Sequence, residues 1–134
     1  MRAAVEGRGT ADLRLLGVTV LTSFDENDLA DLGTSKSVAD LVEQRAGKAS
    51  LAGMNGIVCS AWETAAMRTL LGPDKLLVVP GIRSAGVAAG DQKRVATPRE
   101  AVEAGASYLV IGRQINRAAD PRSEALRILD EILG

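Results

Sequence analysis

Histidine is absent from this chain of 134 residues, and cysteine occurs once, at Cys59. These scarcities exclude a disulfide within one chain, a zinc site of the Cys/His type and any mechanism that uses a histidine base. Aromatic residues are also few, with one phenylalanine, one tryptophan and one tyrosine. The apolar content of 46% is therefore mainly Ala, Val, Leu and Ile, which favours parallel strands covered by helices.

Strong net charge and long apolar runs are missing as well. A net charge of −1 gives no basic footprint for nucleic acid or for an anionic membrane, and it fits a small anionic ligand better. The longest apolar run, residues 15–21 interrupted by Thr19, is too short to span a bilayer. The N-terminus lacks the apolar stretch of a signal peptide. We therefore expect a cytoplasmic protein with no nucleic-acid or membrane partner.

Short apolar segments alternate along the chain with stretches of helical periodicity. The segments expected to form strands are residues 15–21, 56–59, 76–79 and 107–111. The stretches expected to form helices are residues 1–8, 38–51, 61–71, 98–104 and 121–133, with Ala125, Leu126, Leu129 and Leu133 on the inner face of the last one. Ser60 and Thr97 are expected caps, and Thr97 forms a capping box with Glu100.

This alternation predicts βαβ units and a parallel sheet. Four such units make up half of a (βα)8 TIM barrel, so we expect a single α/β domain over residues 1–134. An open four-stranded α/β sandwich is the alternative, because periodicity identifies the units and does not show whether the sheet closes.

Two motifs that follow the last two expected strands predict a phosphate site. Pro80, Gly81 and Arg83 follow the third strand, and Gly112 and Arg113 follow the fourth. Gly81 lets the backbone approach a ligand, and Arg83 offers a planar fork of donors that suits phosphate oxygens. In a TIM barrel the loops after the last two strands form a phosphate pocket.

Two further segments carry polar groups toward the same edge. Residues 83–96, which contain Gln92, are rich in Gly and Ala and suit a lid over a bound anion, or else a flexible surface loop. Thr22 and Ser23 follow the first strand, where their hydroxyls can meet the polar edge of a planar ring or simply cap a turn.

Other reactive or polar residues have a structural interpretation. We expect Cys59 to fill the core and Trp62 to serve packing or an interface. The acidic residues of the next segment are expected to form a solvated helix start; they are Asp25, Glu26, Asp28 and Asp31.

Five motifs taken together resemble the orotidine 5′-phosphate decarboxylase family. They are residues 16–23, 56–60, 80–83, 90–94 and 108–113, in the family's order and at its spacing. The resemblance covers nearly the whole chain and corresponds to the C-terminal half of the family's barrel, strands five to eight. It implies a lyase of pyrimidine biosynthesis that converts orotidine 5′-phosphate (OMP) into UMP and CO2 without a metal or organic cofactor.

The resemblance also implies roles for individual residues. Arg83, Gln92, Gly112 and Arg113 match the family's binders of the nucleotide 5′-phosphate, and Pro80 belongs to the same motif. Thr22 and Ser23 match the end of strand five that lies against the pyrimidine. The implied ligand is a nucleotide 5′-phosphate of the OMP or UMP type.

The family's reactive motif, Asp-x-Lys-x-x-Asp, is not in this chain. The nearest string begins at Asp91 and has Ala96 at its last position. We therefore assign no catalytic residue and expect the chain alone to be inactive. Met1 falls where the family's fourth barrel helix should be ending, so we interpret the chain as truncated.

A half barrel has two open edges and an exposed apolar face. We therefore expect a homo-oligomer, such as a dimer, or a complex with a complementary N-terminal half. Two other functions stay open: a non-catalytic, self-assembling half barrel that holds phosphate or UMP, and a different phosphate-handling barrel such as the related ketogulonate-phosphate decarboxylases.

Overall fold

A computed structural model, which describes residues 1–88 and 90–134, contains one sheet of four parallel strands. The strands are β1 (Leu16–Val18), β2 (Gly56–Val58), β3 (Leu76–Val79) and β4 (Tyr108–Leu109), in the order β1-β2-β3-β4. Each strand therefore lies beside the next one in the chain. This order is that of a barrel segment, whereas a doubly wound sheet reverses its order at a switch point.

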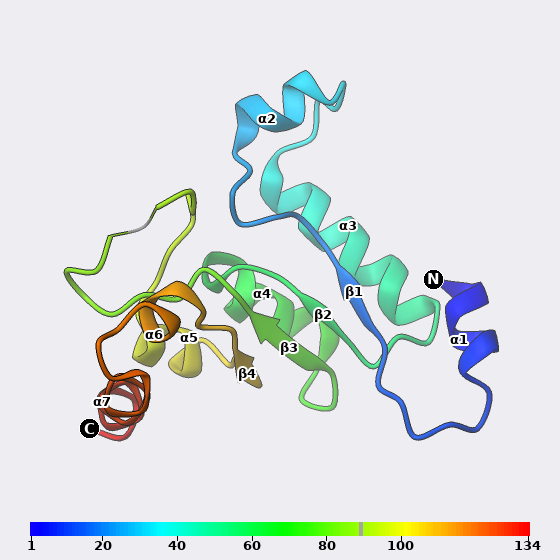
Figure 1. Ribbon diagram of the computed structural model, residues 1–134. Coiled ribbons are helices and arrows are strands. Elements are labelled where there is room, and N and C mark those ends of the chain that lie inside the picture. Colours follow the sequence, from blue (N-terminus) through cyan, green and yellow to red (C-terminus); the bar gives the residue numbers. More distant parts are fainter. Residues whose placement is uncertain (89) are drawn as a thin grey trace.

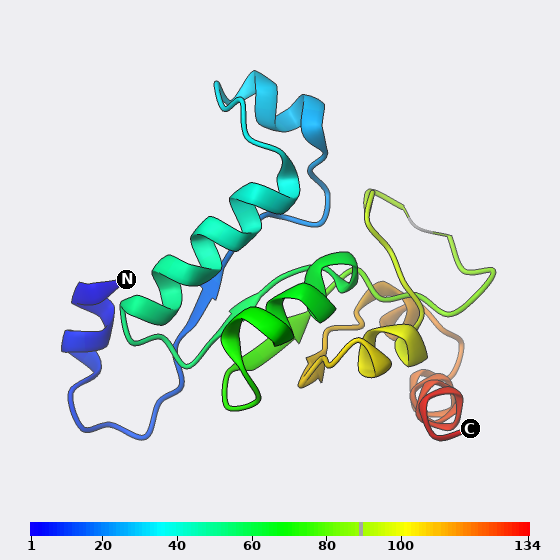
Figure 2. The ribbon, with the colours of Figure 1, turned by 180° about the vertical axis from the view of Figure 1, so that it is seen from behind.

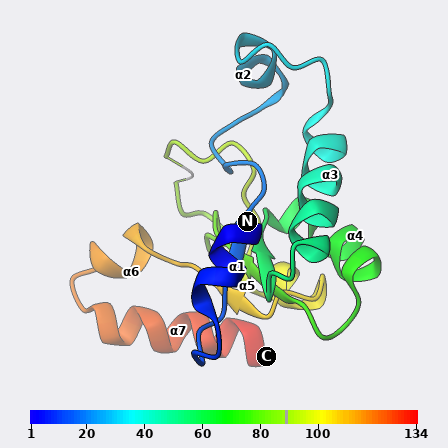
Figure 3. The ribbon, with the colours of Figure 1, turned by 90° about the vertical axis from the view of Figure 1, so that its right-hand side faces the viewer.

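Some of the helices cover one face of this sheet (Figure 2). The helices of the described residues are α1 (Arg2–Arg8), α2 (Glu26–Asp31), α3 (Val38–Leu51), α4 (Ala61–Leu71), α5 (Pro98–Glu103), α6 (Arg113–Asn116) and α7 (Pro121–Leu133). Figure 2 shows α3, α4 and α5 in front of the strands, and Figure 1 shows the opposite face, where the strands lie in front. The N-terminal α1 and the C-terminal α7 lie at opposite ends of the sheet, while α2 stands away from it (Figures 1 and 3).

Small residues let the helix layer and the strands approach closely. A Cβ atom at Gly17 of β1 would lie 2.9 Å from the Cβ of Ala49 on α3. A Cβ atom at Gly56 of β2 would collide with the carbonyl oxygen of Leu76 on β3. The two glycines are thus required by close packing, and the main core that forms around them is aliphatic.

Side chains and prolines define the helix starts as expected. The Thr97–Glu100 capping box is present ahead of α5, with Pro98 in its first turn. At α4, the Glu63 carboxylate accepts a hydrogen bond of 3.1 Å from the N–H of Ser60. The predicted boundaries of α3, α4 and β3 are confirmed. The N-terminal helix ends at Arg8, as predicted, and Gly9 is its C-cap.

The edge strands are shorter than the predicted segments 15–21 and 107–111. At β4, however, ladder hydrogen bonds continue on both sides: the N–H of Ser107 donates to Leu77 (2.8 Å), and that of Val110 donates to Val79 (2.9 Å). At β1 the ladder continues to Thr19, whose N–H donates to the carbonyl of Val58 (3.1 Å), and the next three carbonyl groups bind a distant loop, as described below.

The inner face predicted for the last helix is wrong. Leu126 is 49% exposed, and Ala125, Leu129 and Leu133 are exposed as well, whereas Ile128 is 4% exposed. The helix packs against α5, so its buried face includes Ile128 rather than the predicted set. Next to it, an open apolar groove of about 360 Å³ runs between α7 and β4.

The face of the sheet without helices presents aliphatic and aromatic side chains to solvent. Val18, Val58, Val78 and Tyr108 pair across the four strands, and Val18 and Tyr108 are 59% and 55% exposed. Within residues 1–88 and 90–134, the edge strands β1 and β4 each pair with one neighbour. Such a face in a protein of this size indicates a surface that something else covers.

Candidate functional site

The predicted site segments lie at one edge of the sheet. Residues 22–23 follow β1, residues 80–83 follow β3 and residues 112–113 follow β4. Because the carboxyl ends of parallel strands share an edge, these segments are brought together although they are far apart in the sequence. The long loop after β3 rises from this same edge (Figures 1 and 2).

Two of the predicted arginines line one pocket. This arginine pocket has a volume of about 230 Å³, and its lining residues are Arg83, Val87, Ala88, Gly90, Arg113, Gln114 and Arg117. Arg83 is buried, and its Nη1 donates to the carbonyl of Ile82 (2.6 Å). Planar guanidinium groups that converge in this way suit the oxygens of a phosphate.

Arg113 lies against the loop of residues 83–96. A Cβ atom at Gly90, whose φ is +67°, would lie 3.2 Å from Nη1 of Arg113, so glycine gives the guanidinium room. Arg113 also donates to the carboxylate of Asp91, and this hydrogen bond lowers the pKa of Asp91. The Asp91 carboxylate thus occupies Arg113, one of the two arginines predicted to bind a phosphate.

A polar network surrounds Gln114, one of the residues that line the arginine pocket. The N–H of Ser84 donates to Gln114 Oε1 (3.0 Å), and Gln114 Nε2 donates to Glu124 (2.7 Å). Hydrogen bonds from Arg127 and Gln114 lower the pKa of Glu124 to about 2. The backbone next to Arg83 is therefore tied to the helix that carries Arg113.

Thr22 and Gln92, two more of the predicted residues, contact each other. Thr22 is buried, and its hydroxyl donates to Gln92 Oε1. The N–H groups of Lys93 and Arg94 donate to the carbonyl of Thr22, at 3.1 and 3.3 Å. Two residues that the sequence assigns to one ligand are thus adjacent in space.

The remaining predicted residues have less specific surroundings. Ser23 and Pro80 are half-buried next to Thr22 and Gly81 respectively. Gly112 precedes α6, and a Cβ atom there would meet nothing within 4 Å, so close packing does not explain this glycine. Ligand contacts by these three residues stay predictions.

The structure gives a reason for glycine at position 81 that the sequence did not reveal. Its φ is +77°, and a Cβ atom there would lie 3.0 Å from the carbonyl oxygen of Arg94 and 3.5 Å from Gln92 Oε1. In this structure the bare backbone of Gly81 makes room for the returning loop.

The predicted lid includes residue 89, which lies outside the described residues. We name residues 92–96 the strap, because this part of the loop is bound along its length. Ala96 pairs with Ile82, the indole N–H of Trp62 donates to the carbonyl of Val95 (3.0 Å), and Lys93 Nζ lies 2.8 Å from Asp25. A mobile lid would therefore have to lie ahead of the strap, and its motion stays a prediction.

The expected solvated helix start is also a binding partner of the strap. Asp25 caps α2, as its position predicts, and the hydrogen bond from Lys93 lowers the pKa of Asp25 to about 2. Asp28 contacts the same ammonium group at 2.7 Å.

Sequence reasoning missed four residues of this edge. Gln114 and Arg117 line the arginine pocket, and Arg94 and Glu63 form a buried ion pair beneath the strap. Arg117 lies four residues after Arg113, a spacing that could have indicated a shared face. Arg94 was part of a recognised motif, but a sequence does not show which cation is buried.

Cys59 is buried, as expected of a core residue, and burial raises the pKa of its thiol to about 11. Among residues 1–88 and 90–134, no group of three or more Cys, Asp or Glu side chains is placed to hold a metal ion. None of the helices in that part of the chain is long and apolar enough to cross a membrane.

Comparison with known proteins agrees with the geometry. Residues 1–128 match the family described as Orotidine 5'-phosphate decarboxylase / HUMPS family. The chain is 55% identical over 134 residues to orotidine 5'-phosphate decarboxylase of Rhodopseudomonas palustris strain BisA53, covering 100% of this chain and 57% of that protein. It is 56% identical over 135 residues to the enzyme of that name from Methylobacterium sp. strain 4-46, covering 98% and 57%. The chain spans a little over half the length of these curated relatives.

Solved structures confirm the expected half barrel. Orotidine 5'-phosphate decarboxylase from Lactobacillus acidophilus superposes with a TM-score of 0.76 at 33% identity, covering 94% of this chain and 52% of that one. The enzyme from Pyrococcus horikoshii OT3 gives a TM-score of 0.70 at 24% identity and covers 98% and 55%, which shows the shared fold. Both are TIM barrels, of which this chain matches about half.

Proposed function

The chain belongs to the orotidine 5′-phosphate decarboxylase / HUMPS family, and we propose that it supplies the half of such an enzyme that binds the nucleotide. The observation that carries the proposal is the arginine pocket, where Arg83 and Arg113 converge although 29 residues lie between them. A 5′-phosphate carries two negative charges, and two guanidinium groups provide matching charge and paired hydrogen bonds.

We propose that Thr22 and Ser23 bind the pyrimidine. Gln92, which the family resemblance assigns to the 5′-phosphate, contacts Thr22, and we propose that its carboxamide also reaches the pyrimidine. A hydroxyl and a carboxamide each donate and accept hydrogen bonds, as the amide edge of a uracil ring requires. The contact between Thr22 and Gln92 supports this assignment because the two polar groups are adjacent in space although 69 residues lie between them. Pro80 and Gly112 complete the proposed set as backbone contacts.

Decarboxylation is proposed to need residues from outside this chain. The Asp-x-Lys-x-x-Asp motif that the family resemblance requires is absent from the 134 residues. Without that lysine, the chain has no assigned group to protonate the carbon that loses CO2. We therefore propose that the chain alone is inactive, and that turnover of OMP to UMP needs a second half that carries the motif but no cofactor.

The uncovered sheet face supports a partner for this half. Its exposed Val18 and Tyr108, together with the open edges of β1 and β4, match what the interior of a barrel would present. We propose that residues 1–134 form one unit that pairs with a complementary N-terminal half or with a second copy, in the cytoplasm.

Mixing tests the two parts of the proposal. The purified chain is combined with a fragment of a relative that contains Asp-x-Lys-x-x-Asp, and loss of orotidylate absorbance is followed. Activity that neither part shows alone supports an enzyme half. Persistent inactivity, with UMP binding and a dimer in analytical ultracentrifugation, would favour the second candidate, a non-catalytic self-assembling half barrel.

A binding series tests the ligand class. UMP and ribose 5-phosphate are titrated into the chain by calorimetry. Tighter binding of UMP supports the pyrimidine assignment, whereas tighter binding of the sugar phosphate would favour a different phosphate-handling barrel of the ketogulonate-phosphate type.

A further inference from the structure

The side chain of Arg94 leaves the strap and enters the protein interior. Only 5% of it is exposed, although it carries a full positive charge. Its charge is balanced by the carboxylate of Glu63, which is itself buried at the start of α4. Removing the two charges from water costs free energy, which their mutual attraction and further hydrogen bonds must offset.

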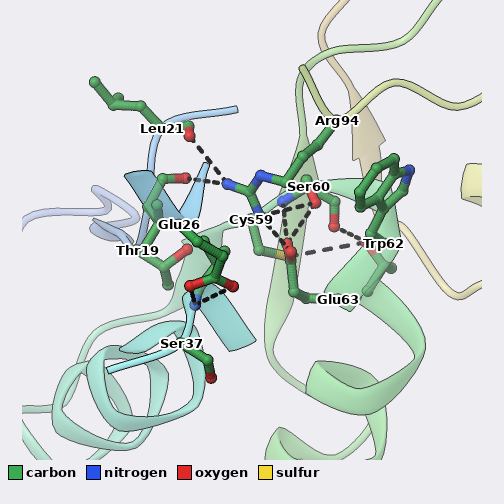
Figure 4. A network of polar contacts seen from close by, with 12 residues as sticks. Thr19, Leu21, Glu26, Ser37, Cys59, Ser60, Trp62, Glu63 and Arg94 are labelled. Carbon is green, nitrogen blue, oxygen red and sulfur yellow. Dashed lines mark hydrogen bonds and ion pairs between the residues drawn. The ribbon is translucent and has the colours of Figure 1, made fainter. Parts of the chain in front are cut away.

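The guanidinium of Arg94 connects two parts of the binding edge. One amino group donates to Glu63 and lies 3.3 Å from the hydroxyl of Ser60. The other donates to the main-chain carbonyls of Val20 (3.3 Å) and Leu21 (3.0 Å). Figure 4 shows the group between Leu21 on one side and Ser60 and Glu63 on the other.

These carbonyls belong to the two residues immediately before Thr22. The backbone N–H of Arg94 donates to the carbonyl of Thr22 itself, at 3.3 Å. One residue therefore holds three successive carbonyl groups of the segment that carries Thr22. Since Gln92 is two positions before Arg94 in the strap, the same contacts also fix where its side chain begins.

Glu63 is oriented independently of Arg94. Its carboxylate accepts a hydrogen bond of 3.1 Å from the N–H of Ser60 and another from the Ser60 hydroxyl. The carboxylate is thus bound to the first turn of α4 and offers Arg94 a fixed point.

We propose that Arg94, held by Glu63, is a positioning residue that sets the contact between Thr22 and Gln92 and thereby the recognition of the pyrimidine. The inference rests on the proposed function for the role of that contact. The backbone that follows Arg83 is tied to α6, which begins at Arg113, by the hydrogen bond from the N–H of Ser84 to Gln114, and this contact does not involve the strap. Loss of Arg94 should therefore weaken recognition of the base much more than recognition of the phosphate.

Arg68 provides a matched control. It lies on α4, and its guanidinium also donates to main-chain carbonyls, those of Gly72 (2.8 Å), Lys75 (2.7 Å) and Gly105 (2.8 Å). These carbonyls precede β3 and β4, at the end of the strands opposite the site. Arg68→Gln thus removes a similar set of bonds without touching the strap.

The binding experiment compares the wild-type chain, Glu63→Gln/Arg94→Gln and Arg68→Gln. The double variant removes both buried charges together, so that neither is left uncompensated. The calorimetry is done at a temperature where all three proteins are folded. The UMP dissociation constant of the double variant should be about tenfold higher than that of the wild-type chain. Its dissociation constant for ribose 5-phosphate should change by less than about threefold. Arg68→Gln should change neither constant, despite a lower melting temperature. Equal UMP affinity in the double variant, or an equal loss in Arg68→Gln, would overturn the inference.

A second readout needs no ligand. Trp62 is the only tryptophan of the chain, and its indole N–H bonds to the strap at Val95. The double variant should shift the single indole signal in an NMR spectrum, and Arg68→Gln should leave it in place. An unmoved indole signal in the double variant would overturn the positioning role. If the wild-type chain binds UMP no more tightly than ribose 5-phosphate, the pyrimidine proposal fails, and the indole signal still decides the role of Arg94.

Discussion

Replacing Arg113 with alanine tests whether the arginine pocket binds a phosphate. A charge-assisted hydrogen bond contributes about 1.5–3 kcal/mol. The Arg113 side chain is 42% exposed and already bonds to Asp91, so solvent and this competing carboxylate reduce its net contribution. We therefore expect a loss of about 1.5–2 kcal/mol, which corresponds to a rise of about 10- to 30-fold in the dissociation constant of UMP.

The assay is a calorimetric titration of UMP at low and moderate salt. Arg122→Ala, on the exposed surface of α7, is the matched control and should leave the constant unchanged. Ionic strength matters because the other cations of the pocket, Arg83 and Arg117, would still attract the phosphate through their charge. A UMP constant that is the same for Arg113→Ala and the wild-type chain would refute the phosphate assignment.

Three further predictions concern competition, acid stability and packing. Asp91→Asn should tighten UMP binding severalfold, because it removes the carboxylate that occupies Arg113; weaker binding would show instead that Asp91 contacts the ligand. The pKa of Asp25 is about 2 in the folded chain, below its ordinary value of 3.8, so its stabilisation is present above pH 4 or so and is lost as the pH falls toward 2. The urea midpoint should accordingly fall between pH 6 and pH 3 by a larger amount in the wild-type chain than in Asp25→Asn, and parallel curves would contradict this. Gly56→Ala should destabilise the fold by about 3 kcal/mol, because the added methyl group collides with the next strand. Gly47→Ala, at an open helical site, should be neutral or stabilising by about 0.5–1 kcal/mol in the same denaturation experiment, and similar melting curves for the two variants would refute the packing argument.

The uncovered face of the sheet bears on all of these measurements. Binding and stability will depend on protein concentration if a second copy covers Val18 and Tyr108, because association stabilises the folded state by mass action. Each titration is therefore best made at two concentrations, and the oligomeric state measured alongside it.

The sequence by itself determined the repeating units and predicted that two arginines meet at one edge of the sheet. Alternating aliphatic strands and capped helices are local patterns, so β3, α3 and α4 could be placed to the residue. Arg83 and Arg113 could be expected to lie in one pocket because each comes four residues after the end of a strand, and the carboxyl ends of parallel strands share one edge.

Only the tertiary structure decided which side chains are buried and what they hold. The inner face of α7 was predicted wrongly because the elements packed against a helix decide which of its residues are buried. Leu126 is exposed to solvent, although the sequence pattern placed it in the core. Gly81 and Arg94 depend on a loop that returns from far along the chain to cross the end of β1. Contacts between segments some 70 residues apart leave no periodic trace in the sequence, since they arise from where the loop packs and not from local backbone preference.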